Sequence, residues 1–163
     1  TTENDIVEGN ARTCFHEDWT TKSYLLDRLE EVNTLLYACV STYSRYNNIV
    51  SPEMDDSWYT IMNKGSKVQR HRHEGSVLSG TLFVNAPEGS HGLAFTNPTI
   101  PHKMGMRSPT PGQDYAHLEE VQSGDLLIYP SWMEHFVPAI ECDNRTTINF
   151  NTYYPTYKMK QGD

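Results

Sequence analysis

Two patterns of apolar residues divide this chain of 163 residues into a helical part and a longer β-rich part. Between residues 20 and 47, apolar side chains recur at steps of three and four, as in an amphipathic helix: Leu25, Leu29, Val32, Leu36, Cys39 and Tyr43. Thr20 or Thr21 is expected to cap its start, and Asn47-Asn48 followed by Pro52 is expected to end it. We expect this helix to cover a sheet and to carry no chemistry.

After Pro52 the pattern changes to short β-type runs separated by turn residues. Strands are predicted at residues 58–62, 67–73, 77–84, 92–96, 125–129, 136–140 and 145–154. Many short strands at this spacing predict a sandwich or barrel, with its core at residues 57–154. Residues 1–19 show no period and are expected to form an extended arm. The whole chain, 1–163, is expected to be a single domain.

One long segment, residues 97–114, interrupts the predicted strands. It holds four prolines (Pro98, Pro101, Pro109 and Pro111) and has no apolar period. Such a loop in a compact domain is usually a lid, a binding loop or a disordered segment.

The composition narrows the kind of partner. The formal charge is −8, from 13 basic and 21 acidic residues, and no Lys/Arg run occurs. This argues against nucleic acid or an anionic membrane surface as the main partner. No signal peptide and no membrane-spanning stretch is visible, and the three scattered cysteines fit reduced thiols, so a cytoplasmic location is expected. The oligomeric state is not indicated.

Three histidines are the strongest candidates for chemistry. His71 and His73 lie two residues apart in a predicted strand, so their imidazoles share one face. His135 follows another predicted strand and a turn. Together they predict an open-sided metal site, for which non-haem iron, zinc or copper is suitable. The other histidines, His16, His91, His102 and His117, are interpreted as ordinary surface or core residues.

Several segments, in this order and spacing, resemble the 2-oxoglutarate- and iron(II)-dependent oxygenases. They are 58–73, Leu78-Ser79-Gly80, Gly124-Asp125-Leu126, Tyr129-Pro130-Ser131-Trp132 with His135, and the run from Arg145 to Asn151. The similarity is closest to a prolyl-hydroxylase-like branch with many phage-encoded members, and it covers roughly residues 57 to 152. It implies a mainly β fold, a cupin-like jelly roll or double-stranded β-helix, supported here by the N-terminal α-helix.

The resemblance also implies roles for individual residues. The iron ligands fall on His71, His73 and His135, the 2-oxoglutarate-binding arginine falls on Arg145, and its hydroxyl partner falls on Thr147. The pattern agrees, because Arg145, Thr147, Asn149 and Asn151 alternate with Thr146, Ile148 and Phe150, so that one strand face is polar. Substrate contacts are expected from Trp58, Trp132, Asn149 and Asn151. No catalytic residue beyond the metal ligands is expected.

The activity that the resemblance implies is hydroxylation. Fe(II), 2-oxoglutarate and O2 would be used, 2-oxoglutarate would be decarboxylated to succinate, and the substrate would be a small molecule or a prolyl or other residue of a peptide or protein. One departure is that His73 stands where most of these enzymes have a carboxylate ligand, so that iron should be held more weakly or replaced by another metal.

Two alternatives remain open beside this one. The first is a cupin-type three-histidine dioxygenase that does not use 2-oxoglutarate, and the second is a metal- or ligand-binding barrel without turnover. Arg145 and Thr147 favour the 2-oxoglutarate-dependent enzyme, because the alternatives have no use for a group that grips a dicarboxylate.

A last expectation concerns the strands at 136–140 and 145–151. If they form a regular hairpin closed by residues 141–144, His135 and Arg145 lie on opposite faces of it. Because the site needs both on one side, a β-bulge near Pro138, or a loop of odd length, is predicted.

Overall fold

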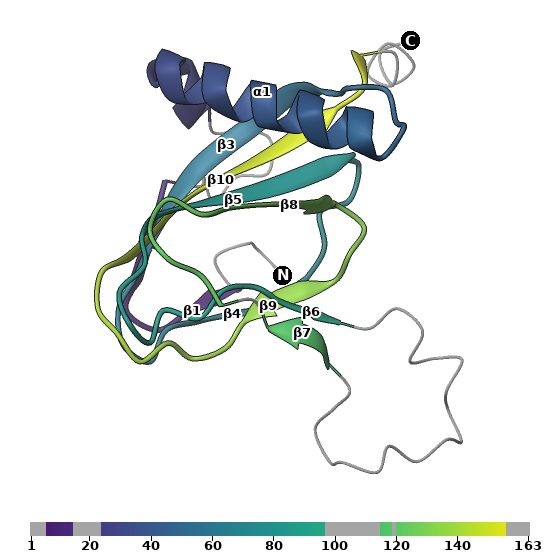
Figure 1. The fold of residues 1–163 in the computed structure, drawn as a ribbon. Helices are drawn as coiled ribbons and strands as arrows, with labels where there is room; N and C mark the ends of the chain where they lie inside the picture. Colours follow the sequence, from purple (N-terminus) through teal and green to yellow (C-terminus); the bar gives the residue numbers. More distant parts are fainter. Residues whose placement is uncertain (1–5, 15–23, 97–114, 119, 156–163) are drawn as a thin grey trace, which may run out of the picture.

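Two antiparallel β-sheets and one covering helix make up the part of the chain that the computed structural model describes, residues 6–14, 24–96, 115–118 and 120–155. The sheets face each other, and the helix α1 lies over the outer face of one of them (Figure 1). This arrangement confirms the predicted mainly β, jelly-roll fold class with a supporting helix.

Each sheet has five strands among the described residues. The first sheet has the order β1 (Val7–Glu8), β4 (Lys67–His71), β9 (His135–Val137), β6 (Ala94–Thr96) and β7 (Tyr115–Leu118). The second sheet has the order β2 (Ala11–Thr13), β3 (Glu53–Met62), β10 (Arg145–Tyr153), β5 (Leu78–Asn85) and β8 (Leu126–Pro130).

The helical region is shorter than predicted at its start. A 3-10 turn at Leu25–Arg28 is followed by a break at Leu29, with φ −125° and ψ 61°, and α1 then runs over Glu30–Tyr46. The predicted caps, Thr20 and Thr21, lie outside the described residues. The end agrees with the prediction, because Asn47 is the C-cap and Asn48 has a φ of 55°.

The buried side of α1 packs on the second sheet. Leu36 and Val40 are at most 1 % exposed and form one core cluster with Leu78 of β5 and with Ile148 and Phe150 of β10. A second cluster lies between the sheets and contains Met62, Leu93, Tyr129, Val137 and Ile140. The outer cluster therefore fixes the helix, and the inner one holds the sheets together beside the candidate site.

The seven predicted strands are all present, each with shifted bounds, and three further strands occur among the described residues. The described part of the predicted arm, residues 6–14, forms two short strands, of which β1 pairs with β4 and β2 pairs with β3. The β core therefore begins in this arm, and β3 begins at Glu53, before residue 57. Strand β7 was not predicted, and the proline-rich loop 97–114 lies outside the described residues.

The predicted hairpin was wrong. β9 pairs with β4 and β6 in the first sheet, whereas β10 pairs with β3 and β5 in the second. The chain crosses from one sheet to the other between them, so no bulge at Pro138 is needed. His135 and Arg145 line the same cavity because they lie on facing sheets.

None of the described helices is long and apolar enough to cross a membrane.

The packing of α1 on the second sheet can be tested with two neighbouring leucines. Leu36 is 1 % exposed and Leu35 is 61 % exposed. Leu36→Ala should lower the free energy of unfolding by about 2–5 kcal/mol, because it leaves a cavity in the outer core. Leu35→Ala should change it by less than about 0.5 kcal/mol. Urea unfolding of both variants measures the difference, and equal losses would contradict this packing.

Candidate metal centre

Three histidines meet between the two sheets. His71 ends β4, His73 lies two residues beyond that end, and His135 begins β9. One possible ligand atom from each lies within 4.8 Å of the others. The three histidines predicted as ligands therefore lie close together, although His73 lies outside the strand and its backbone N–H donates to the carbonyl of Ser131 at 3.0 Å.

A register shift in β4 turns His71 into the cavity. Val68 pairs with Val137 and His71 pairs with His135, so one residue more separates the pairs on β4 than on β9. Val68 and His71 both line the cavity, although residues three apart in a regular strand face opposite sides. The bulge that the site requires is therefore in β4.

Backbone carbonyls orient two of the imidazoles. Nδ1 of His71 lies 2.8 Å from the carbonyl oxygen of Gln69, and Nδ1 of His135 lies 2.9 Å from that of Met133. A carbonyl accepts only, so each Nδ1 carries the proton and each Nε2 presents its lone pair to the cavity. This arrangement is common in metal-binding histidines.

The spacing of the nitrogens suits a metal ion. Nε2 of His73 and Nε2 of His135 lie 3.4 Å apart. Two nitrogens that are each about 2.1 Å from one ion and subtend 90–110° lie about 3.0–3.4 Å apart.

Burial in the cavity keeps the three imidazoles neutral. Burial lowers the pKa of His71. Burial, together with the neighbouring imidazoles of His135 and His71, holds the pKa of His73 well below its usual range. Burial and the charge of His71 lower the pKa of His135 to about 3. Neutral imidazoles are the form that binds metal.

A tyrosine that the sequence did not single out touches the same centre. The hydroxyl of Tyr129, in β8, lies 3.2 Å from Nε2 of His135, and burial raises the pKa of this phenol. The phenol therefore donates to the lone pair that a metal would use. In the sequence it was only part of a segment that resembles the oxygenases, with no role assigned to it.

Arg145, the first residue of β10, is buried beside the histidines at 2 % exposure. Its Nε donates to the carbonyl of His91 at 3.3 Å, and its guanidinium lies 5.1 Å from the centre of the Phe83 ring. Nη2 is buried and has no hydrogen-bond partner among the described residues. Burial lowers the pKa of Arg145 to about 10, so the side chain is still charged at neutral pH.

Thr147 and Asn149 follow Arg145 on the cavity side of β10. Nδ2 of Asn149 donates to the hydroxyl oxygen of Thr147 at 3.2 Å and lies 3.3 Å from that of Thr60. The hydroxyl of Thr81 donates to Oδ1 of Asn149 at 3.1 Å. Because Thr147 accepts from Asn149, its own O–H is available to a ligand.

The remaining predicted site residues are divided between the cavity and the outside. Trp58 lines the cavity, with its ring centre 6.0 Å from that of His73. Trp132 is 61 % exposed and Asn151 accepts a hydrogen bond from Ser79, and neither lines the cavity. Lining residues that the sequence did not indicate include Ile6, Val7 and Thr13 of the arm, Thr60, Thr81 and Tyr129.

The residues present fit both a metal ion and an acidic ligand. Three neutral imidazoles supply the nitrogen donors, with no carboxylate among the described residues of the cluster. Nη2 of Arg145 and the hydroxyl of Thr147 supply donors that suit a carboxylate.

Comparison with solved structures supports the fold. A viral collagen prolyl hydroxylase from Paramecium Bursaria Chlorella virus-1, in complex with 2-oxoglutarate, has a TM-score of 0.56 at 8% identity, covering 88% of this chain and 78% of that one. A Pseudomonas putida prolyl-4-hydroxylase has a TM-score of 0.53 at 12% identity, with 88% and 72% covered.

A third structure, an oxidoreductase of the 2OG-Fe(II) oxygenase family from Burkholderia pseudomallei, has a TM-score of 0.48 at 13% identity. It is matched over 63% of this chain, and the chain spans 45% of that protein's length. No curated protein matches the chain.

The match by family is more direct. The family described as "Putative 2OG-Fe(II) oxygenase" matches residues 56–151, which is more than half of the chain and contains all three histidines, Arg145 and Thr147. The chain therefore belongs to this family of 2OG-Fe(II) oxygenases.

Proposed function

We propose that the protein is a 2-oxoglutarate- and Fe(II)-dependent dioxygenase that hydroxylates its substrate. One oxygen atom of O2 would enter the substrate and the other would enter succinate, with release of CO2 from 2-oxoglutarate. The observation that carries this proposal is the buried guanidinium of Arg145, whose Nη2 lacks a partner among the described residues and which lines the same cavity as the three histidines.

Each side of the cavity has a separate task in this proposal. His71, His73 and His135 of the first sheet would hold the iron through Nε2. On the second sheet, Arg145 would pair with the carboxylate of 2-oxoglutarate that is remote from the keto group. Thr147 would donate its hydroxyl proton to the same carboxylate. The dicarboxylate would therefore lie across the gap between the sheets.

When bound, the iron supplies the oxygen activation and the redox chemistry that no protein side chain provides. The chain supplies neutral imidazoles and a fixed cation that line one cavity. Orienting the co-substrate from the Arg145 side reserves the side near Trp58 for the substrate.

The substrate class that we propose is a residue of a peptide or protein, with proline as the first candidate. Two structures of similar fold are titled as prolyl hydroxylases. Trp58 and Asn149 line the cavity and are the proposed contacts. Contacts from Trp132 and Asn151 would need the substrate to extend beyond the cavity.

A second candidate is a three-histidine dioxygenase that does not use 2-oxoglutarate. The observation that favours it is His73, an imidazole at the position where most relatives have a carboxylate. It gives no role to Arg145, and burying that charge without a ligand would then bring no benefit.

Turnover of the co-substrate separates the two candidates. With Fe(II), O2 and proline-containing peptides, the protein should form succinate from 2-oxoglutarate in proportion to hydroxylated product, measured by mass spectrometry. Product without succinate would support the second candidate. The assay should also include free proline and other peptides. If no hydroxylated product forms from any of them, and no succinate forms without product, both candidate functions are contradicted.

The buried cation of Arg145 leads to two effects of opposite sign. Its pKa of about 10 corresponds to a burial cost on the order of 3 kcal/mol for the charged form. Arg145→Met should therefore raise the unfolding free energy of the ligand-free protein by about 1–2 kcal/mol. It should also weaken 2-oxoglutarate binding about 10- to 100-fold, because a charged hydrogen bond is lost.

Urea unfolding and calorimetric titration of 2-oxoglutarate measure these two effects. Arg12→Met is the matched control, because Arg12 lies exposed on β2. Unchanged affinity for 2-oxoglutarate in Arg145→Met would place the co-substrate elsewhere.

The three histidines can be tested by spectroscopy without turnover. Anaerobic Fe(II) with 2-oxoglutarate should give a weak visible charge-transfer band, and His71→Ala or His135→Ala should abolish it. His73→Asp should retain iron, because it restores the carboxylate found in most relatives, whereas His73→Ala should lose it. A band of unchanged strength in the alanine variants would remove these residues from the metal site.

A further inference from the structure

We propose that β1, at the N-terminal arm, positions the metal ligand His71 from outside the cavity, and that Glu8 is the side chain that fixes it. This rests on the proposed function, since it concerns a ligand of the proposed metal. The connection runs from Glu8 and Ile6 through Gln69 to the ring of His71.

The backbone of Gln69 is held by its two neighbours in space. Its N–H donates to the carbonyl of Ile6 at 2.6 Å, and its carbonyl accepts from Nδ1 of His71, with 2.8 Å between the atoms. The direction of the His71 imidazole therefore depends on where the backbone of Gln69 lies. The carbonyl of Ile6 holds this backbone through the Gln69 N–H, from the side of β4 opposite to β9.

Strand β9 contributes little to holding Gln69. The pairing of β4 with β9 shifts register between Val68 and His71, so Gln69 and Arg70 lie in the irregular stretch. On the other edge of β4, Val7 pairs with Val68 and Glu8 pairs with Lys67. The regular ladder next to the bulge is therefore the one with β1.

The side chain of Glu8 closes the connection. One carboxylate oxygen accepts from the side-chain amide of Gln69, and the other lies 2.8 Å from Nζ of Lys67. These two hydrogen bonds lower the pKa of Glu8. An exposed ion pair alone stabilises a fold only slightly. In this proposal, the interactions of Glu8 select the register of β1 on β4, and that register places the carbonyl of Ile6 opposite the N–H of Gln69.

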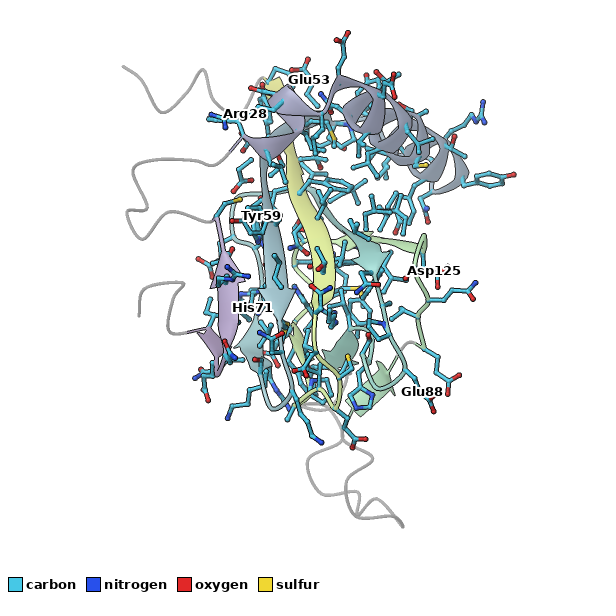
Figure 2. All side chains as sticks on the ribbon, turned by 90° about the vertical axis from the view of Figure 1, so that its left-hand side faces the viewer. Arg28, Glu53, Tyr59, His71, Glu88 and Asp125 are labelled. Carbon is cyan, nitrogen blue, oxygen red and sulfur yellow. The ribbon has the colours of Figure 1, made fainter. Side chains whose placement is uncertain are left out.

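The arm is anchored to both sheets. Figure 2 shows its two short strands, in purple, beside the labelled Tyr59 and His71. Gly9 turns the chain between them with a φ of 94°, and a Cβ there would lie 2.9 Å from Cα of Ser66. Beyond the turn, the hydroxyl of Thr13 donates to the carbonyl of Tyr59 at 2.8 Å.

The test is an anaerobic titration of the metal-free full chain with Co(II), followed by its visible absorption. Three substitutions at one position give a graded series. Glu8→Gln keeps an acceptor for Gln69 and should bind Co(II) like the parent. Glu8→Ala should bind about threefold more weakly, with a changed spectrum.

Glu8→Pro should bind Co(II) roughly tenfold more weakly than the parent, which is at the lower end of the loss caused by removing a hydrogen-bond partner of a metal ligand. The bond from Gln69 to Ile6 sets the antiparallel pattern in which the N–H of residue 8 faces Lys67, and proline has no N–H. If Glu8→Pro does not fold, the Gln and Ala variants decide the question.

Glu74→Ala is the matched control. Glu74 is next to His73 in the sequence, is 77 % exposed and pairs with Arg72, so its loss removes the same charge near the metal without touching Gln69. Parent-like affinity and spectrum in both Glu8→Ala and Glu8→Pro would overturn the inference, even if their melting temperatures fall.

A different result of the same titration would contradict the proposed function. If the parent does not bind Co(II), or if His71→Ala binds it equally well, the metal centre itself is wrong and this inference falls with it. If His71→Ala loses Co(II) and the Glu8 variants do not, only the role of the arm is overturned.

Discussion

The core under α1 and the candidate site meet on strand β10. Both of its edges pair, with β3 and with β5, and both of its faces are covered. Ile148 and Phe150 contribute to the core under α1, whereas Arg145, Thr147 and Asn149 line the cavity. The polar face is acceptable in the interior because most of its groups are hydrogen-bonded: Nε of Arg145 donates to the carbonyl of His91, and Nδ2 of Asn149 donates to Thr147. The packing under α1 and the polar lining of the cavity both depend on this alternation.

Much of this could be predicted from the residues. The alternation in β10 depends on period two alone, so the face shared by Arg145 and Thr147 was correct. The spacing of His71 and His73 and the residue type of His135 led to the right cluster, because imidazoles seldom gather in a cavity without a ligand. The helix end at Asn47 and Asn48 was set by local chemistry in the same way. The alternation in β10, the closeness of His71 to His73 and the helix end are each decided within a few residues, whereas His135 comes from a distant strand.

What could not be predicted depends on how distant segments are placed. Neighbours in sequence often pair, and that assumption made β9 and β10 a hairpin, whereas the chain changes sheets after Ile140. The bulge in β4 lies in its pairing with β9, a strand far away in the sequence, and no local pattern records it. β1 and β2 are two and three residues long and too short to show a period. Tyr129 was missed because its partner, His135, lies on the other sheet, and the sequence does not show which residues of the two sheets meet.

The arm has a consequence for solubility as well. β3 and β4 would end their sheets with unpaired backbone N–H and C=O groups, and an open edge is a template on which another chain can add a strand. Among the described strands, β1 and β2 take the outer positions instead. Each is so short that it offers little length for such pairing, and Glu8 places a charge on β1, where it pairs with Lys67 of β4. The arm beside the three histidines therefore also leaves little open sheet edge among the described strands.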